Sequence, residues 1–181
     1  TEGQVETFAY IPNNVSNDVS VINVATNTVV ATIPVGDSPI GVAISPDGTK
    51  VYVTNNFSNF VTVINTATNS VIGTINVGDY PSGIAVSPDG SQIYVTYIYS
   101  NFISIFNTIS NALTATVAVG VSPIGVIVSP DGTKAYVTNS NSDSLSVIST
   151  STNSILATIA VGDTPVGVCN SMDGTLVYVA N

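Results

Sequence analysis

The sequence predicts an all-β fold built from a repeated four-stranded antiparallel unit, and three observations support this prediction. Glycines, prolines and a Ser-Pro-Asp-Gly turn recur every 42 residues. Each interval contains four short runs rich in Val, Ile, Thr and Tyr, which favour strands. No stretch of apolar residues has a helical period long enough for a helix. With 181 residues, 44% of them hydrophobic, the chain can form one domain with a sizeable core.

The period is visible at single positions. The recurring glycines are Gly36, Gly78, Gly120 and Gly162, and the recurring prolines are Pro39, Pro81, Pro123 and Pro165. The Ser-Pro-Asp-Gly turns lie at 45–48, 87–90 and 129–132, and Met replaces Pro in the copy at 171–174. In this turn Pro occupies the second position and Gly takes the left-handed conformation. We therefore expect positive φ at the turn glycines.

One complete unit has strands at 40–45, 50–55, 60–65 and 70–77, separated by turn sequences. A tandem four-stranded unit of about 40 residues is typical of a β-propeller blade. A β-solenoid is the second interpretation, although its rungs are shorter and lack four turns per period. We expect about four blades, or part of a larger propeller.

The domain prediction is a single β-propeller over residues 1–181. Its complete repeats are 40–81, 82–123 and 124–165, and its partial repeats are 1–39 and 166–181. The third and fourth strands at 19–35 can combine with the first and second strands at 166–181. That exchange would close a four-bladed ring and remove the free sheet edges.

The second strand of each unit carries a tetrapeptide close to Tyr-Val-Thr-Asn. The copies are Tyr-Val-Thr-Asn at 52–55 and 136–139, Tyr-Val-Thr-Tyr at 94–97 and Tyr-Val-Ala-Asn at 178–181. With its flanking turns, this motif resembles the YVTN β-propeller repeat family over nearly the whole chain. The resemblance implies a surface-layer or cell-surface propeller, usually of about seven blades. It implies no single activity, because related propellers include lactonases and haem- or quinone-bearing enzymes.

The composition excludes several classes of function. The net charge is −9 and the only cationic side chains are Lys50 and Lys134, so the chain cannot neutralise a row of phosphates. We therefore expect no nucleic-acid partner and no polybasic contact with a membrane. The absence of His excludes Ser-His-Asp and Cys-His sites and His-ligated metals. No apolar run reaches about 18 residues, so we expect no membrane insertion.

The polar residues indicate where the protein works. Ser, Thr and Asn account for 63 of the 181 residues, whereas charged residues account for 7%. A neutral surface rich in hydroxyls and amides favours an extracellular or cell-surface location, with glycosylation as an option. Asn14 and Asn56 begin Asn-X-Ser sequons. The single cysteine, Cys169, cannot form an internal disulfide and is expected to be a small buried hydrophobe.

Aspartates recur in the turns and in the links between units. They are Asp47, Asp89, Asp131 and Asp173 in the turns, and Asp37, Asp79 and Asp163 in the links. Rings of carboxylates can bind Ca²⁺, but an Asp in a turn commonly accepts hydrogen bonds from its own backbone. Because these residues recur in every blade, we expect a structural role. The prediction is no catalytic residue, no cofactor and no metal, with a structural Ca²⁺ as the alternative.

The loop between the second and third strands breaks the repeat. Its second and third copies carry five aromatic residues: Phe57, Phe60, Tyr97, Tyr99 and Phe102. The first and fourth copies carry Asn and Asp instead. Either the rings form an exposed rim that binds a partner or a glycan, or some of them pack between blades.

Residues 1–13 and 176–181 cover the same phase of the blade, and a closed four-bladed ring needs only one of them. The other segment can fray, cap its own blade, or add to another copy of the chain. For strand donation the apolar contacts would come from Val5, Phe8, Tyr10 and Ile11. The competing explanation is that these residues belong to a longer propeller.

The expected function is a non-catalytic extracellular propeller that mediates self-assembly or adhesion in a surface layer or fibre. Its partners would be further copies of the chain, other surface proteins or glycans. One alternative is a propeller module that binds a carbohydrate or a protein. The second alternative is a propeller enzyme of the lactonase type, using Asp and a metal.

Overall fold

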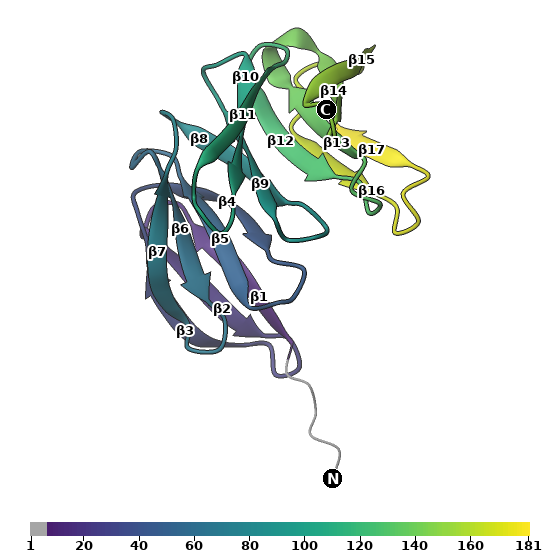
Figure 1. Ribbon diagram of the computed structural model, residues 1–181. Coiled ribbons are helices and arrows are strands. Elements are labelled where there is room, and N and C mark those ends of the chain that lie inside the picture. The colour runs from purple at the N-terminus through teal and green to yellow at the C-terminus, as the bar shows by residue number, and fades with distance from the viewer. Residues whose placement is uncertain (1–6) are drawn as a thin grey trace.

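The computed structural model describes residues 7–181, which form five antiparallel sheets that follow one another along an arc (Figure 1). We number the sheets as blades 1 to 5. Blade 1 contains β1 (Phe8–Asn13), β2 (Asp18–Asn23) and β3 (Thr28–Pro34). Blade 2 contains β4 (Pro39–Ile44), β5 (Lys50–Asn55), β6 (Phe60–Asn65) and β7 (Ser70–Asn76). Blade 3 contains β8 (Pro81–Val86), β9 (Gln92–Tyr97), β10 (Phe102–Asn107) and β11 (Leu113–Ala118).

Blade 4 contains β12 (Pro123–Val128), β13 (Lys134–Asn139), β14 (Ser144–Ser149) and β15 (Ser154–Ala160), with the short 3₁₀ helix η1 (Ser140–Ser142) between β13 and β14. Blade 5 contains β16 (Gly167–Asn170) and β17 (Val177–Ala180). Consecutive strands are paired in sequence order within each sheet. These pairings confirm the predicted all-β propeller fold with about four blades.

The described sheets do not close into the four-bladed ring that the sequence allowed. β2 and β3 pair with β1, from Phe8 opposite Asn23 to Asn13 opposite Asp18, whereas β16 pairs with β17. Blade 1 and blade 5 therefore lie at opposite ends of the arc (Figure 1). The physical reason is local, because β1 can form a short hairpin with β2. In addition, the Tyr10 ring is buried in the hydrophobic cluster between blades 1 and 2.

The hydrophobic core consists of three clusters, one at each of the first three junctions between neighbouring blades. Strand β5 shows how one strand serves two of them. Val51 and Val53 join the cluster with blade 1, and Tyr52 joins the cluster with blade 3. Second strands are thus buried on both faces, which explains why their sequence is apolar without alternation.

The threonine of the Tyr-Val-Thr-Asn motif joins each blade to the next one. The Thr54 hydroxyl donates to the backbone oxygen of Ser82 at 2.5 Å and accepts a hydrogen bond from the Gly41 amide at 2.8 Å. The Thr96 hydroxyl likewise donates to the Ile124 oxygen and accepts from the Gly83 amide. The Thr138 hydroxyl donates to the Val166 oxygen and accepts from the Gly125 amide. A Cβ atom at Gly41 would collide with the Ser82 oxygen, so glycine permits the close approach.

Blade 5 differs from the blades before it because one of its faces packs against no further described blade. Cys169, Leu176 and Tyr178 are exposed there. Cys169 is therefore not the buried hydrophobe that its position in the repeat predicted. Among residues 7–181, no helix has the length and apolar character needed to cross a membrane.

Candidate functional site on the loop face

Each blade connects its strands at two ends, which define two faces of the arc. The turn face carries the Ser-Pro-Asp-Gly turns and the turns between third and fourth strands. The loop face carries the loops between second and third strands and the links to the following blade. Backbone hydrogen bonds join loop to link, for example from Asn56 N to Ser38 O at 2.9 Å and from Ser122 N to Ser100 O at 2.8 Å.

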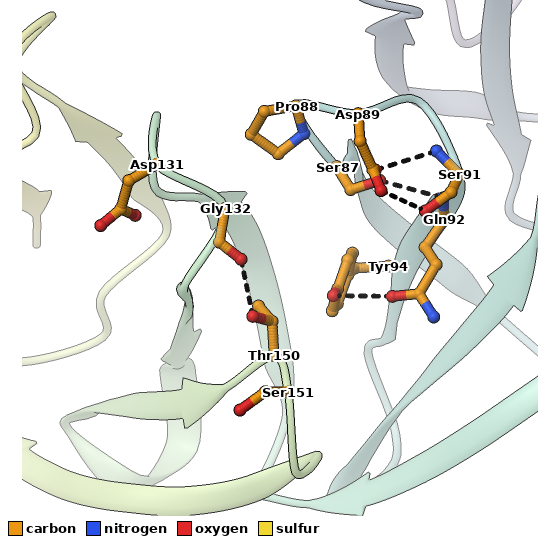
Figure 2. Close-up of a pocket in the computed structure, with 10 residues that line it drawn as sticks. All are labelled: Ser87, Pro88, Asp89, Ser91, Gln92, Tyr94, Asp131, Gly132, Thr150 and Ser151. Atoms are coloured by element: carbon orange, nitrogen blue, oxygen red, sulfur yellow. Dashed lines mark hydrogen bonds between the residues drawn. The ribbon is translucent and has the colours of Figure 1, made fainter.

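A cleft of about 580 Å³ lies on the turn face between blades 3 and 4 (Figure 2). Asp89 and Asp131 come from the two adjacent turns, but their carboxylates do not point toward each other in Figure 2. Ser87 Oγ donates to Asp89 Oδ1 at 2.5 Å, and the Ser91 amide donates to the same oxygen at 3.0 Å. The carboxylate of Asp89 therefore stabilises its own turn.

The same bonds recur in every Ser-X-Asp-Gly turn, and they lower the carboxyl pKa. Ser129 Oγ and the Thr133 amide, together with the Thr133 hydroxyl, bring the pKa of Asp131 down to about 2. Corresponding bonds act on Asp47, Asp89 and Asp173. In the described part of the chain, no group of three Asp, Glu or Cys side chains is placed to hold a metal ion. The turn-face carboxylates accept hydrogen bonds from the hydroxyls and amides of their own turns.

Clefts of the same construction also lie between blades 2 and 3 and between blades 4 and 5. Each contains turn aspartates and a tyrosine of the Tyr-Val-Thr-Asn motif. Burial raises the pKa of Tyr52 and Tyr94, so these phenols are neutral packing groups at ordinary pH. A feature that repeats at successive junctions is a product of the blade itself, whereas a specific site is expected where the repeat is broken.

The loop face breaks the repeat, and the structure divides the five aromatic residues of the predicted rim into two groups. Phe60, Tyr97 and Phe102 pack inward. The Tyr97 ring lies over Gly78, where a Cβ atom would come within 3.1 Å of Tyr97 Cε1, and the rings of Tyr97 and Phe102 are 5.3 Å apart. Phe57 and Tyr99 point outward, with exposed fractions of 67% and 80%.

Tyr80 connects the two exposed rings. Its ring centroid lies 6.2 Å from that of Phe57 and 5.1 Å from that of Tyr99, with interplanar angles of 87° and 85°. These are edge-to-face contacts, which the aromatic quadrupole favours. We call Phe57, Tyr80 and Tyr99 the aromatic ladder. It runs from the loop of blade 2, across the link, to the loop of blade 3.

Sequence reasoning missed Tyr80 because it searched only the loops for broken symmetry. The signal was nevertheless present in the link. The positions equivalent to Tyr80 are Ser38, Ser122 and Thr164, and all four residues have φ between 55° and 59°. Positive φ is uncommon for a bulky aromatic residue. Tyr80 is thus an aromatic residue in a conformation where the other blades use small hydroxyl residues.

Position 80 lacks a side-chain hydrogen bond that two of its equivalents make. Ser38 Oγ accepts from Asn14 Nδ2 at 2.6 Å, and Ser122 Oγ donates to the backbone oxygen of Ile98. Both bonds join the link to the loop of the preceding blade. At the Tyr80 link the loop bonds to the backbone instead, since Asn56 Nδ2 donates to Pro81 O at 3.0 Å. The Tyr80 ring is 40% exposed and faces outward.

Backbone bonds hold the ladder in place. The Phe57 amide donates to the Asp37 oxygen at 3.2 Å, and the Ile98 amide donates to the Tyr80 oxygen at 3.2 Å. Asn59 Oδ1 also accepts from the Tyr80 amide at 3.4 Å. Asn59 Nδ2 in turn donates to Asp79 Oδ1 at 2.9 Å. The rings are therefore presented on an ordered backbone with an amide–carboxylate pair beside them.

The other predicted site residues have the following positions. Asn14 is exposed, whereas Asn56 is buried and its Nδ2 donates to the backbone oxygen of Pro81 at 3.0 Å. Of the two sequons, only that of Asn14 has its asparagine at the surface. Of the residues named for strand donation, Phe8, Tyr10 and Ile11 belong to β1, where Tyr10 is buried and Ile11 is exposed. Val5 lies outside the described residues. Donation of β1 to another chain stays a prediction.

The fold and the interblade contacts define a repeat β-propeller, and the comparisons with known proteins agree. Residues 5–87 match the family model described as YNCE-like beta-propeller. This match and the structural likenesses confirm the resemblance to YVTN-type repeat propellers. A comparison with curated protein sequences finds no match.

Among solved structures, the chain is similar to Kuenenia stuttgartiensis hydrazine synthase, with a TM-score of 0.88 and 25% identity. A functionally unknown protein from Desulfotomaculum acetoxidans DSM 771 gives a TM-score of 0.85 and 23% identity. The alignments cover 99% and 94% of this chain but 58% of each of those chains. The dihydro-heme d1 dehydrogenase NirN aligns with a TM-score of 0.75 and 17% identity, over 98% of this chain and 40% of NirN.

These likenesses correct one expectation. The sequence-based prediction that the protein is not an enzyme is contradicted, because propellers of this shape occur in a hydrazine synthase and in a dehydrogenase. The recurrence of a residue in every blade bears on that residue's role and not on whether the protein is an enzyme.

Proposed function

We propose that this chain is a binding module in which the aromatic ladder holds a ligand on the loop face. The observation that carries the proposal is Tyr80. It occupies a positive-φ position at which the other blades have Ser or Thr, and it contacts both Phe57 and Tyr99. The ring is large and partly exposed, and it stands at a position where the equivalent residues are small and carry a hydroxyl. Exposed aromatic clusters of this kind are typical of interaction surfaces.

The biological role that we propose is adhesion by an exported propeller. The hydroxyl-rich and amide-rich composition supports export, and the ladder supplies a surface for attachment. Self-assembly in a surface layer or fibre is the second form of the proposal. It is supported by the resemblance of the Tyr-Val-Thr-Asn repeats to those of surface-layer propellers.

A binding assay on immobilised targets tests the ladder. The targets are neutral polysaccharides, acidic polysaccharides and extracellular proteins, and the proteins compared are the wild type and Tyr80→Ser. We expect at least one target to bind the wild type and to lose about tenfold in affinity with Tyr80→Ser, the effect of about one aromatic contact. Equal binding by both proteins, or no binding to any target, would contradict the proposal.

The chain offers a matched control for the loss of an exposed apolar side chain. Ile109 is 88% exposed in the turn between β10 and β11, on the turn face. Ile109→Ser should bind like the wild type. If Ile109→Ser and Tyr80→Ser lose binding equally, the effect is general surface hydrophobicity and the ladder is not the site.

A further inference from the structure

We infer that the ligand of the aromatic ladder is an uncharged polysaccharide. This inference rests on the proposed function and names the chemistry of the ligand at the same site. Three properties of the described loop face lead to it: its charge, the geometry of its rings and the polar groups around them.

The charge of the site disfavours anionic ligands. Both lysines begin second strands, Lys50 in β5 and Lys134 in β13, and their backbone amides bond to the Ser-X-Asp-Gly turns of the turn face. The ladder instead lies beside the carboxylate of Asp79, within a molecule of net charge −9. Glycans that carry sulfate or uronic acid groups would meet repulsion without a compensating cation. An uncharged ligand meets no such penalty.

The ring geometry suits sugars. A pyranose presents a face of polarised C–H groups, and the face of an aromatic ring carries the negative part of its quadrupole. In the ladder, each ring is nearly perpendicular to the next one, so an edge of one ring borders the face of its neighbour. The result is a corrugated surface made of small, separate ring faces, each close in size to a single sugar ring.

The extent of the patch points the same way. A stable protein interface buries about 1,200–2,000 Å² in total, with an apolar centre. The ladder has three rings, and the loop residues beside them are Ser58, Asn59, Ser100 and Asn101. The Ser100 hydroxyl is engaged with the backbone of Tyr97 and Phe102. Ser58 Oγ accepts from the Asp37 amide. The Ser58 O–H and the exposed Asn101 amide can hydrogen-bond to sugar hydroxyls. The Asn59–Asp79 pair supplies donors and acceptors in a fixed arrangement.

The direction of the ladder favours an extended saccharide of several sugar units over a single sugar. Its rings come from two successive blades and from the link between them, so the contact surface is elongated. Backbone bonds to the rings' own segments hold this surface before any ligand arrives. A preordered elongated surface lowers the entropic cost of binding an extended saccharide.

Affinity electrophoresis tests the ligand class with the intact chain. Native gels contain either a neutral polysaccharide, namely a soluble β-glucan, a galactomannan or a xylan, or acidic polygalacturonate. We expect retardation of the wild type by at least one neutral polymer and no retardation by polygalacturonate. Tyr80→Ser and Phe57→Ser should each weaken the affinity about tenfold. Tyr80→Phe, which keeps the ring, should stay within about threefold of the wild type.

The outcomes separate the ligand class from the proposed function. If the ladder variants lose binding to an acidic glycan or to an immobilised protein while no neutral polymer binds, the ligand class is wrong and the ladder remains a binding site. If no target shows ladder-dependent binding, both proposals fail. If Tyr80→Phe loses as much affinity as Tyr80→Ser, binding depends on the phenol hydroxyl and the stacking argument is overturned. Circular dichroism of each variant verifies that the fold is retained.

Discussion

Position 80 and its equivalents share one backbone conformation but carry different kinds of side chain. All four link residues adopt positive φ, and in blades 2 and 4 the serine hydroxyl also bonds to the preceding loop. Small polar residues tolerate this conformation at lower cost than a bulky aromatic ring does. Tyr80 therefore departs from the residue type that this conformation favours, and this leads to a prediction about stability that is separate from binding.

Tyr80→Ser should leave the denaturation midpoint unchanged or raise it, because Ser is the residue that the equivalent positions use. The reciprocal change, Ser122→Tyr, should lower the free energy of unfolding by about 1 kcal/mol, since it removes the hydroxyl that bonds to the Ile98 oxygen. Urea denaturation of both variants measures this. A large destabilisation by Tyr80→Ser would mean that Tyr80 has a structural role.

The turn aspartates predict how stability depends on pH. Hydrogen bonds lower the pKa of Asp131 from 3.8 to about 2 in the folded protein. A carboxyl with a lowered folded pKa contributes stability above its unfolded pKa, and this contribution is lost as the pH falls from about 4 toward 2. The difference in unfolding midpoint between the wild type and Asp131→Asn should therefore be present at pH 6 and disappear near pH 2.

Thermal denaturation across this range provides the measurement. A constant difference between the two proteins from pH 6 to pH 2 would show that the folded state does not lower the pKa of the Asp131 carboxyl.

The turn glycine beside Asp131 has the conformation that the sequence predicted. Gly132 has φ of 72°, and Gly48 and Gly90 have 70° and 73°.

At the scale of strands, the threonine of the second strand is the main polar contact between blades. The Thr96 hydroxyl donates to Ile124 O at 2.6 Å and accepts from the Gly83 amide at 2.8 Å. Thr96→Val keeps the shape but leaves both backbone groups without this partner at a buried junction. We expect a loss of about 1–3 kcal/mol in the free energy of unfolding. Thr96→Ser keeps the hydroxyl and serves as the control.

Guanidinium denaturation compares the two variants. If Thr96→Val is no less stable than Thr96→Ser, the hydroxyl does not join the blades. The inner glycines make the contact possible, because a Cβ atom at Gly83 would collide with Ile124 O. Thr96 and Gly83 are therefore two parts of one interblade contact.

The outer strands illustrate how exposed sheet edges are modified. In β3, β7 and β15 the register with the neighbouring strand shifts at a bulge, and an apolar residue occupies the extra position. These residues are Val30, Ile72 and Leu156, and all three are exposed. A bulge twists an edge and interrupts its row of hydrogen-bonding groups, which hinders pairing with another sheet.

At the scale of the whole molecule, the first strand of blade 5 leaves a thiol exposed. Cys169 lies on β16 and is exposed. We therefore expect a maleimide to label Cys169 in the native chain at a rate close to that in urea. Strong protection in the native state would contradict this exposure.

Mass spectrometry after timed labelling gives the rate directly, since Cys169 is the only cysteine. The likeness to larger proteins is consistent with an open arc. The chain aligns over nearly its full length with 58% of the hydrazine synthase chain, so its blades are arranged as in part of that longer chain. A four-bladed ring would require a sharper turn between successive blades.

The sequence by itself determined the blade. Its period of 42 residues, its strand runs and its turn glycines all depend on local preferences, and neighbouring residues suffice to express them. The same local signals predicted that the turn aspartates accept hydrogen bonds within their own turns, and these bonds are present. They also pointed to the loops around Phe57 and Tyr99, where the repeat is broken.

Tertiary structure decided which blade elements meet. The open arc, the exposure of Cys169 and the inward packing of Tyr97 depend on contacts between residues far apart in the chain, and a repeat has several registers that satisfy the same local rules. The ladder is of this kind, because Phe57, Tyr80 and Tyr99 come together only when two blades pack side by side. Sequence periodicity describes what is equivalent between blades, whereas a binding site arises where neighbouring blades differ.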